Sequence, residues 1–161
     1  TVQLSLKDGY RKERRPRSSS PDASYQVAYL QAFLKAEQRD IKQNNKLYKE
    51  IVERDPFDDA QVNIIDLIQE GQARIDLLQP LIEEARSKGM SNQAFANQLR
   101  TRQVKLNTKA DKLQQKEEIL GETDYDEDEF EKVISARHAA EWQSMVLTGI
   151  IHDIERGETF R

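Results

Sequence analysis

The sequence feature that most constrains the fold is a leucine repeat within residues 91–121. Leucine recurs there at intervals of seven residues, at Leu99, Leu106, Leu113 and Leu120. A second series in the same segment is basic, with members three and four residues apart: Arg102, Lys105, Lys109, Lys112 and Lys116. On an α-helix these spacings give two stripes, one narrow and apolar and the other basic. The leucines therefore require other helices to cover them, and the basic stripe requires water or acidic groups.

The positions between the leucines argue against a free-standing homodimeric leucine zipper. These positions are small or polar, and they hold Ala96, Gln103, Ala110 and Glu117. Dimeric zippers usually carry β-branched residues at the equivalent positions. Small residues favour close packing among several helices, so the repeat predicts a helix inside a bundle.

Three further segments of the sequence carry apolar residues at the three- and four-residue spacing of a helix. The first begins at Pro21, which suits the first turn, and ends near Arg54, because Pro56 disfavours helix at the preceding residue. The second ends at Gly89 and the last near Gly157, since glycine commonly terminates helices. With the leucine segment included, the predicted helices cover residues 21–54, 58–88, 91–120 and 126–156.

Unusual residues interrupt the apolar series of two of these helices. In the first, Glu37 and Asn44 occupy apolar positions; Asn commonly fixes helix register there, and Glu37 requires a basic partner or an edge position. In the second, Gly71 either allows another backbone to approach closely or only costs about 1 kcal/mol of helix propensity. Pro80 is expected to kink or interrupt the second helix, because it removes a backbone donor and crowds the preceding turn.

The fold class that follows from these patterns is all-α. Short loops make neighbouring helices antiparallel, which predicts an elongated up-down-up-down bundle of four helices or, as an alternative, coiled-coil hairpins. The composition agrees, with 34% charged residues, 37% hydrophobic residues, 6 glycines and 4 prolines among 161 residues. We expect residues 21–161 to form this helical unit.

Several features of the sequence bear on the compartment of the protein. It contains no cysteine, which excludes disulfides, thiol catalysis and cysteine-bound zinc and fits a reducing compartment. No apolar run approaches the roughly 20 residues that span a bilayer, and the first residues lack the apolar core of a signal peptide. We therefore expect an intracellular protein of the nucleus or cytoplasm. The absence of an initiator methionine predicts a processed chain or an excised fragment.

Residues 1–20 form a basic, Ser- and Arg-rich tail that differs from the rest of the chain. Between Lys7 and Arg17, six basic residues stand against two acidic ones, a net charge of +4 (six minus two). Low hydrophobicity and clustered charge favour disorder. Ser18 and Ser20 are candidate phosphorylation sites, because basic residues precede them and Pro21 follows Ser20. The alternatives are a nuclear localisation signal, a nucleic-acid contact and a solvated linker.

The acidic residues before the last helix suggest a calcium site at first sight. Asp124, Asp126 and Asp128 are spaced like the first three ligands of an EF-hand loop. The sixth position of that loop requires glycine and holds Glu129, and the twelfth requires glutamate and holds Ser135. Both departures argue against calcium binding. The acids are better explained as a favourable lead-in to a helix N-terminus.

No arrangement of residues in the sequence predicts catalysis or a bound cofactor. Each of the two histidines, His138 and His152, is followed three residues later by glutamate, which reverses the order found in di-iron bundles. They lie fourteen residues apart, about 21 Å along a helix, so they cannot bind one metal ion together. The sequence also lacks a glycine-rich phosphate loop and a Ser-His-Asp arrangement. We therefore expect no enzyme, and no catalytic residue, metal site or cofactor.

The basic stripe of the third helix is the first candidate binding surface. It is either solvated or compensated within the chain, since residues 122–131 directly follow the helix and contain seven acids and no base. Two other interpretations are an acidic protein partner and the phosphates of a nucleic acid, which the basic tail would also contact. The stripe has no aromatic residue for base stacking, which makes nucleic acid the weaker of the two.

Apolar residues near the helix seams are the second candidate binding surface. The residues expected to contact a partner are Leu30, Leu34, Glu37, Asn44, Trp142, Met145, Leu147 and Ile151. They predict a non-catalytic helical scaffold or assembly subunit that packs against helical protein partners, as a homo- or hetero-oligomer. The alternative function is a nucleic-acid- or chromatin-associated helical module that uses the basic stripe and the basic tail.

Overall fold

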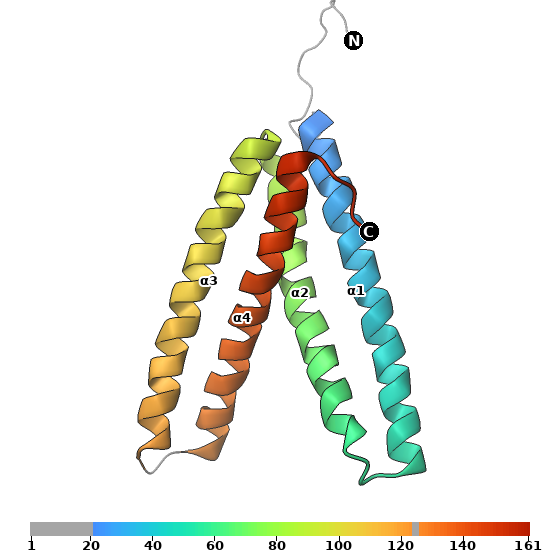
Figure 1. Cartoon of the computed structure of the whole chain (residues 1–161), viewed down its shortest axis with the longest axis vertical. Coiled ribbons are helices and arrows are strands. Elements are labelled where there is room, and N and C mark those ends of the chain that lie inside the picture. Colours follow the sequence, from blue (N-terminus) through green and yellow to red (C-terminus); the bar gives the residue numbers. More distant parts are fainter. Residues whose placement is uncertain (1–20, 124–125) are drawn as a thin grey trace, which may run out of the picture.

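The computed structural model describes residues 21–123 and 126–161, and within them the chain forms four α-helices (Figure 1). They are α1 (Pro21–Arg54), α2 (Ala60–Lys88), α3 (Asn92–Gly121) and α4 (Glu127–Arg156). These bounds confirm the all-α prediction and agree with the predicted helix ends to within two residues. The basic tail, with Ser18 and Ser20, lies outside the described residues, and so does Asp124.

The helices are arranged as two antiparallel hairpins, in which α1 packs on α2 and α3 packs on α4. Figure 1 shows that the hairpins meet at one end of the molecule, which we call the apex. The apex is formed by the start of α1, the end of α2, the start of α3 and the end of α4. Away from it the hairpins diverge as two arms, each ending in a loop. The structure is therefore the pair of hairpins that the sequence left open as the alternative to a continuous bundle.

The hydrophobic core lies at the apex, where all of α1–α4 cover one another. The largest completely buried apolar side chains there come from each helix: Leu30, Leu78, Leu81, Phe95, Leu99, Leu147, Ile150 and Ile154. Burying one such side chain stabilises the fold by roughly 1.5–3 kcal/mol. The segment after α4 adds to this core, because Phe160 stacks on Phe33 with ring centroids 4.5 Å apart and meets Tyr29 edge-on at 5.9 Å.

The leucine repeat of α3 runs from the apex into the arm. Leu99 is completely buried at the apex, whereas Leu106, Leu113 and Leu120 are only half-buried. The difference arises because in the arm α3 has mainly α4 to cover its leucines, while at the apex the other hairpin covers them as well. Ala96 and Ala110, from the series between the leucines, are buried, as the close-packing interpretation requires.

The helix ends are explained by local capping. Gly89 ends α2 and Gly157 ends α4, both in the left-handed conformation, with φ of 59° and 68°. The Ser91 hydroxyl caps α3 by accepting a hydrogen bond from the backbone N–H of Ala94 at 3.2 Å. Asp126 caps α4 in the same way, accepting from the N–H groups of Asp128 and Glu129 at 2.8 and 3.4 Å. The acidic lead-in to α4 thus serves as a helix cap, as its sequence indicated.

Two residues of α2 test more specific predictions. The helix continues through Pro80, so of the two predicted effects, a kink or an interruption, the interruption does not occur. Its neighbours Leu77, Leu78 and Leu81 are all buried in the apex core and hold both sides of the proline in place. Gly71 does permit a close approach, although by side chains of α1 rather than its backbone. A Cβ at this position would lie 2.9 Å from Cγ1 of Ile41.

We predict that the leucines of the repeat contribute unequally to stability, although their spacing is the same. Leu99→Ala removes a fully buried side chain and should lower the free energy of unfolding by about 2–5 kcal/mol. Leu113→Ala should cost less than half as much, because Leu113 is already partly hydrated. Urea denaturation followed by circular dichroism measures both values. Equal losses for the two variants would mean that the arm is as well covered in solution as the apex.

Candidate functional site

Polar residues on the facing sides of α1 and α2 pair with each other inside the first hairpin. Glu37 is only 8% exposed, and its carboxylate lies 3.3 Å from the guanidinium of Arg74, which also pairs with Glu70. Burial raises the pKa of the Glu37 carboxyl, although Arg74 acts in the opposite direction. Asn44 is half-buried beside them and lines a hollow of about 140 Å³. The basic partner that Glu37 requires therefore comes from this chain.

The polar positions of α3 between the leucines are likewise paired, in this case with α4. Gln103 donates hydrogen bonds to the Ser144 carbonyl at 2.6 Å and to the Thr148 hydroxyl at 2.9 Å. Glu117 accepts three hydrogen bonds from Arg137, at 2.9, 3.0 and 3.2 Å, and these raise the pKa of the Arg137 guanidinium. Both arms are thus held by one apolar series and one set of internal polar pairs.

The apolar residues predicted for partner binding fall into three groups in the structure. Leu30, Leu147 and Ile151 are buried in the core of this chain, which occupies them at the apex. Leu34 and Trp142 are half-buried. The remaining apolar residue of the set, Met145, is 70% exposed and lines a hollow of about 420 Å³ beside Phe160. The structure brings most of this set into contact with the chain's own helices.

Further exposed apolar residues lie on the arm of the first hairpin, outside the set predicted for partner binding. They are Leu47, Phe57, Val62, Ile65 and Leu67, which we call the apolar arm. Residues 60–68 of α2 are apolar on all sides of the helix, interrupted only by Gln61, Asn63 and Asp66. This continuous apolar character was the signal available in the sequence.

The basic stripe of α3 is compensated at its two ends and open in its middle. Arg102 pairs with Glu84 of α2, and Lys116 lies 3.4 Å from Glu129 of α4. Lys105, Lys109 and Lys112, which we call the lysine triad, are exposed. Within residues 21–123 and 126–161, the triad forms no ion pair with an acidic side chain. Among these residues, the acidic segment around the start of α4 therefore compensates only Lys116, at the end of the stripe away from the apex.

A groove runs beside the near end of the stripe, between α2 and α3. It encloses about 340 Å³. Its lining comprises Glu84, Gln98, Thr101, Arg102, Lys105, Leu106 and Lys109. Two members of the lysine triad and one half-buried leucine thus share this groove with the internal ion pair of Arg102 and Glu84.

A cluster of titratable residues at the apex joins the end of α4 to α1. The Tyr29 hydroxyl donates to the Asp153 carboxylate at 2.5 Å, and the Tyr25 hydroxyl donates to the Asp153 carbonyl at 3.0 Å. Burial, followed by the nearby Asp153 charge, raises the pKa of both tyrosines. Tyrosine contacts with residues more than one hundred positions away were not detectable from sequence spacing.

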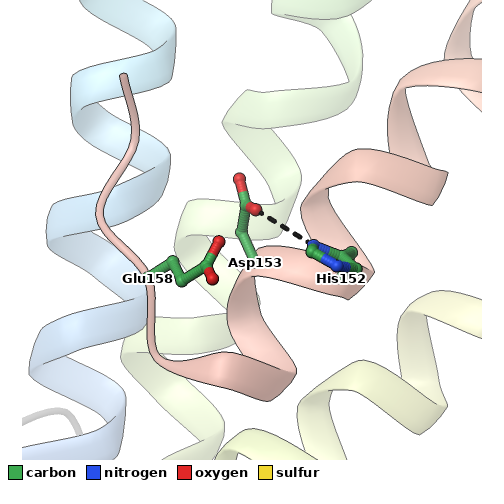
Figure 2. A group of neighbouring side chains, drawn as sticks. All are labelled: His152, Asp153 and Glu158. Carbon is green, nitrogen blue, oxygen red and sulfur yellow. Dashed lines mark hydrogen bonds and ion pairs between the residues drawn. The ribbon is translucent and has the colours of Figure 1, made fainter.

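The same cluster contains the only group in the described part of the chain whose side chains are placed to share a cation. Ligand atoms of His152, Asp153 and Glu158 lie within 4.8 Å of one another. Figure 2 shows His152 and Glu158 on opposite sides of Asp153. His152 is 54% exposed, and one carboxylate oxygen of Asp153 is already held by Tyr29. We assign this cluster to fastening the chain end onto α1 and assign no metal ion to it.

Glu155, the residue that follows His152 by three positions, has a different role. It accepts a hydrogen bond from Arg100 of α3 at 2.6 Å, and this bond lowers the pKa of its carboxyl.

None of the described helices has the length and apolar composition needed to cross a membrane. The chain matches no family model, and no curated protein or solved structure is significantly similar to it.

We predict that Glu37 lowers stability at neutral pH. Its pKa is raised in the folded protein, so the folded state holds the proton more tightly than the unfolded state. The free energy of unfolding therefore falls as the pH rises above the ordinary carboxyl value of 4.5. Glu37→Gln, which mimics the protonated form, should raise the melting temperature at pH 7 and change it little near pH 4. Lower stability of this variant at pH 7 would mean that attraction to Arg74 outweighs burial.

We predict the opposite effect of substitution at Tyr29, whose hydrogen bond stabilises the apex. Tyr29→Phe leaves the Asp153 carboxylate without this donor and should cost about 1–2 kcal/mol at pH 7. Because the tyrosine pKa is raised, wild-type stability falls as the pH rises above 10, and the gap between wild type and variant should narrow there. Guanidinium denaturation at both pH values tests this, with Tyr48→Phe in the first arm as the control. A gap that does not change with pH would contradict it.

Proposed function

We propose that this protein is a non-catalytic helical scaffold, a subunit that joins an assembly by packing its apolar arm against helices of a partner. The observation that supports this best is that α2 is apolar around most of its circumference at residues 60–68. Among the described helices, only α1 packs closely against this part of α2 (Figure 1). Phe57 is 90% exposed and Val62 is 62% exposed. A helix that is apolar on all sides is normally buried on several of them.

The contrast along α2 explains why the arm is the part available to a partner. Near the apex, α2 is covered by α1 on one side and by α4 on another, and Gln143 of α4 donates a hydrogen bond to the Ala73 carbonyl at 2.8 Å. Beyond that point the hairpins diverge (Figure 1). The apolar sequence of α2 continues into the arm, although the second hairpin no longer covers it. A partner helix at the usual packing distance of about 8–10 Å would replace that cover.

The charges around the apolar arm favour a helical protein partner of mixed charge. Acidic residues lie in the loop between α1 and α2 and in the first turns of α2, at Asp55, Asp58, Asp59 and Asp66. The facing part of α1 carries Lys42, Lys46 and Lys49. Both charge signs therefore border the apolar surface, as they do at the edges of helix–helix interfaces. Exposed apolar surface bordered by polar residues is typical of protein interaction sites.

We predict that acidic substitutions in the apolar arm abolish association. The purified chain should bind a hydrophobic dye and should associate with itself or with a co-purifying partner, as measured by multi-angle light scattering. Val62→Glu/Leu67→Glu should remove both properties, because a charge on this surface cannot be buried without a large desolvation cost.

A matched control comes from the other hairpin. Val104→Glu/Ile119→Glu makes the same chemical change at apolar residues of α3 that are each 63% exposed, and it should leave association and dye binding intact. Circular dichroism verifies that both variants remain helical. A wild-type chain that is monomeric at every concentration, recruits no partner and binds no dye would overturn the proposal.

A further inference from the structure

We propose that the groove between α2 and α3 binds an acidic helical segment of a partner protein, whose carboxylates pair with Lys105, Lys109 and Lys112. The site is distinct from the apolar arm and does not depend on it. Its chemistry is that of charge pairing beside a small apolar contact, which Leu106 supplies.

The position of the lysine triad within the basic stripe supports this assignment. On one side of the triad, Arg102 is neutralised by Glu84, and on the other Lys116 is paired with Glu129. Among the described residues no acidic side chain forms an ion pair with the three lysines between them. Residues 21–123 and 126–161 therefore compensate the basic groups at the two ends of the stripe and supply no acidic partner for the lysines in its middle.

The sequence around the triad makes the unpaired charge unusual for an exposed helix. Positions three and four residues before and after each triad lysine hold no Asp or Glu, and several hold another Lys or Arg. Like charges at these spacings destabilise a helix. On α1, by contrast, Lys46 and Lys49 are each followed four residues later by glutamate. Lys42, Lys46 and Lys49 of α1 have the same spacing as the triad, and the glutamates of α1 offset their repulsion; on α3 an acidic ligand would do so.

The spacing of the triad fits a helix as the ligand. Lys105 and Lys112 are seven residues apart, which is about 10 Å along a helix axis. A partner helix with carboxylates at positions i, i+4 and i+7 presents charges on one face with the same spacing. Leu106 lies beside the triad in the groove and can receive an apolar residue of that helix.

The composition of the groove favours such a helix over nucleic acid. Its lining residues include no aromatic side chain on which a base could stack.

Fluorescence anisotropy with a labelled peptide tests the proposal directly. The probe is a synthetic amphipathic helix with glutamates at i, i+4 and i+7 and leucine on the adjoining face, and a duplex DNA of similar length is the competing probe. The full chain should bind the peptide more tightly than the DNA, with an affinity that falls as salt is added. Lys105→Glu/Lys109→Glu/Lys112→Glu should weaken peptide binding by at least about tenfold.

The chain offers a control variant with the same charge change and the same spacing. Lys42→Glu/Lys46→Glu/Lys49→Glu reverses three exposed lysines on α1 and should change peptide affinity by less than about twofold. Helicity by circular dichroism verifies the fold of both variants, and the Lys-to-Gln version of the triad variant repeats the test without adding repulsion. Absence of peptide binding, an equal loss in both variants, or tighter triad-dependent binding of the DNA would each overturn the proposal.

Discussion

The burial of the apex core is the interaction on which the rest of this structure depends. A helical hairpin on its own buries one stripe of each helix, so its side chains remain partly hydrated, as Leu113 does. At the apex two hairpins cover each other, and Leu78, Leu99 and Leu147 become completely inaccessible to water. Stabilisation by burial scales with the apolar area removed from water. The apex is therefore where the fold gains most of its stability, and it positions both arms.

The arms are held by weaker and more specific interactions. Their ion pairs, such as Glu37 with Arg74 and Glu117 with Arg137, lie at partly buried positions where burial opposes the gain from charge attraction. Such pairs set which residues of two helices face each other, and they add little to stability compared with the apex. An arm built this way keeps its shape while leaving much of its surface uncovered. The structure thus separates a stable end from two extended surfaces.

Local features of the fold could be predicted from the sequence, because they depend on a few adjacent residues. The helix ends at Gly89 and Gly157 and the cap at Ser91 belong to this class. The divergence of the hairpins could not be predicted in this way. Leu99 and Leu113 belong to the same seven-residue repeat, yet only Leu99 is also covered by the other hairpin. The continuity of α2 through Pro80 belongs to the second class as well, because the neighbouring leucines are buried in the apex core.

The candidate surfaces show the same division. The basic stripe could be recognised from residue spacing on one helix, but its compensation at the ends depends on Glu84 and Glu129, which lie on other helices. The apex cluster joins Tyr29 to Asp153, a contact that only the completed fold creates. The apolar composition of α2 at the apolar arm can be read from the sequence, whereas the exposure of these residues depends on the divergence of the hairpins.

The two candidate surfaces differ in the force that would hold a partner, and this difference has a consequence for assembly. Contacts through the apolar arm rest on burial of apolar area, which added salt does not screen. Contacts through the lysine triad rest on exposed charges, which salt screens within about 10 Å at 0.1 M. The triad lies on α3 and the apolar arm on α1 and α2, so each surface belongs to a different hairpin. A chain with this arrangement can hold one partner through burial while it exchanges another through charge.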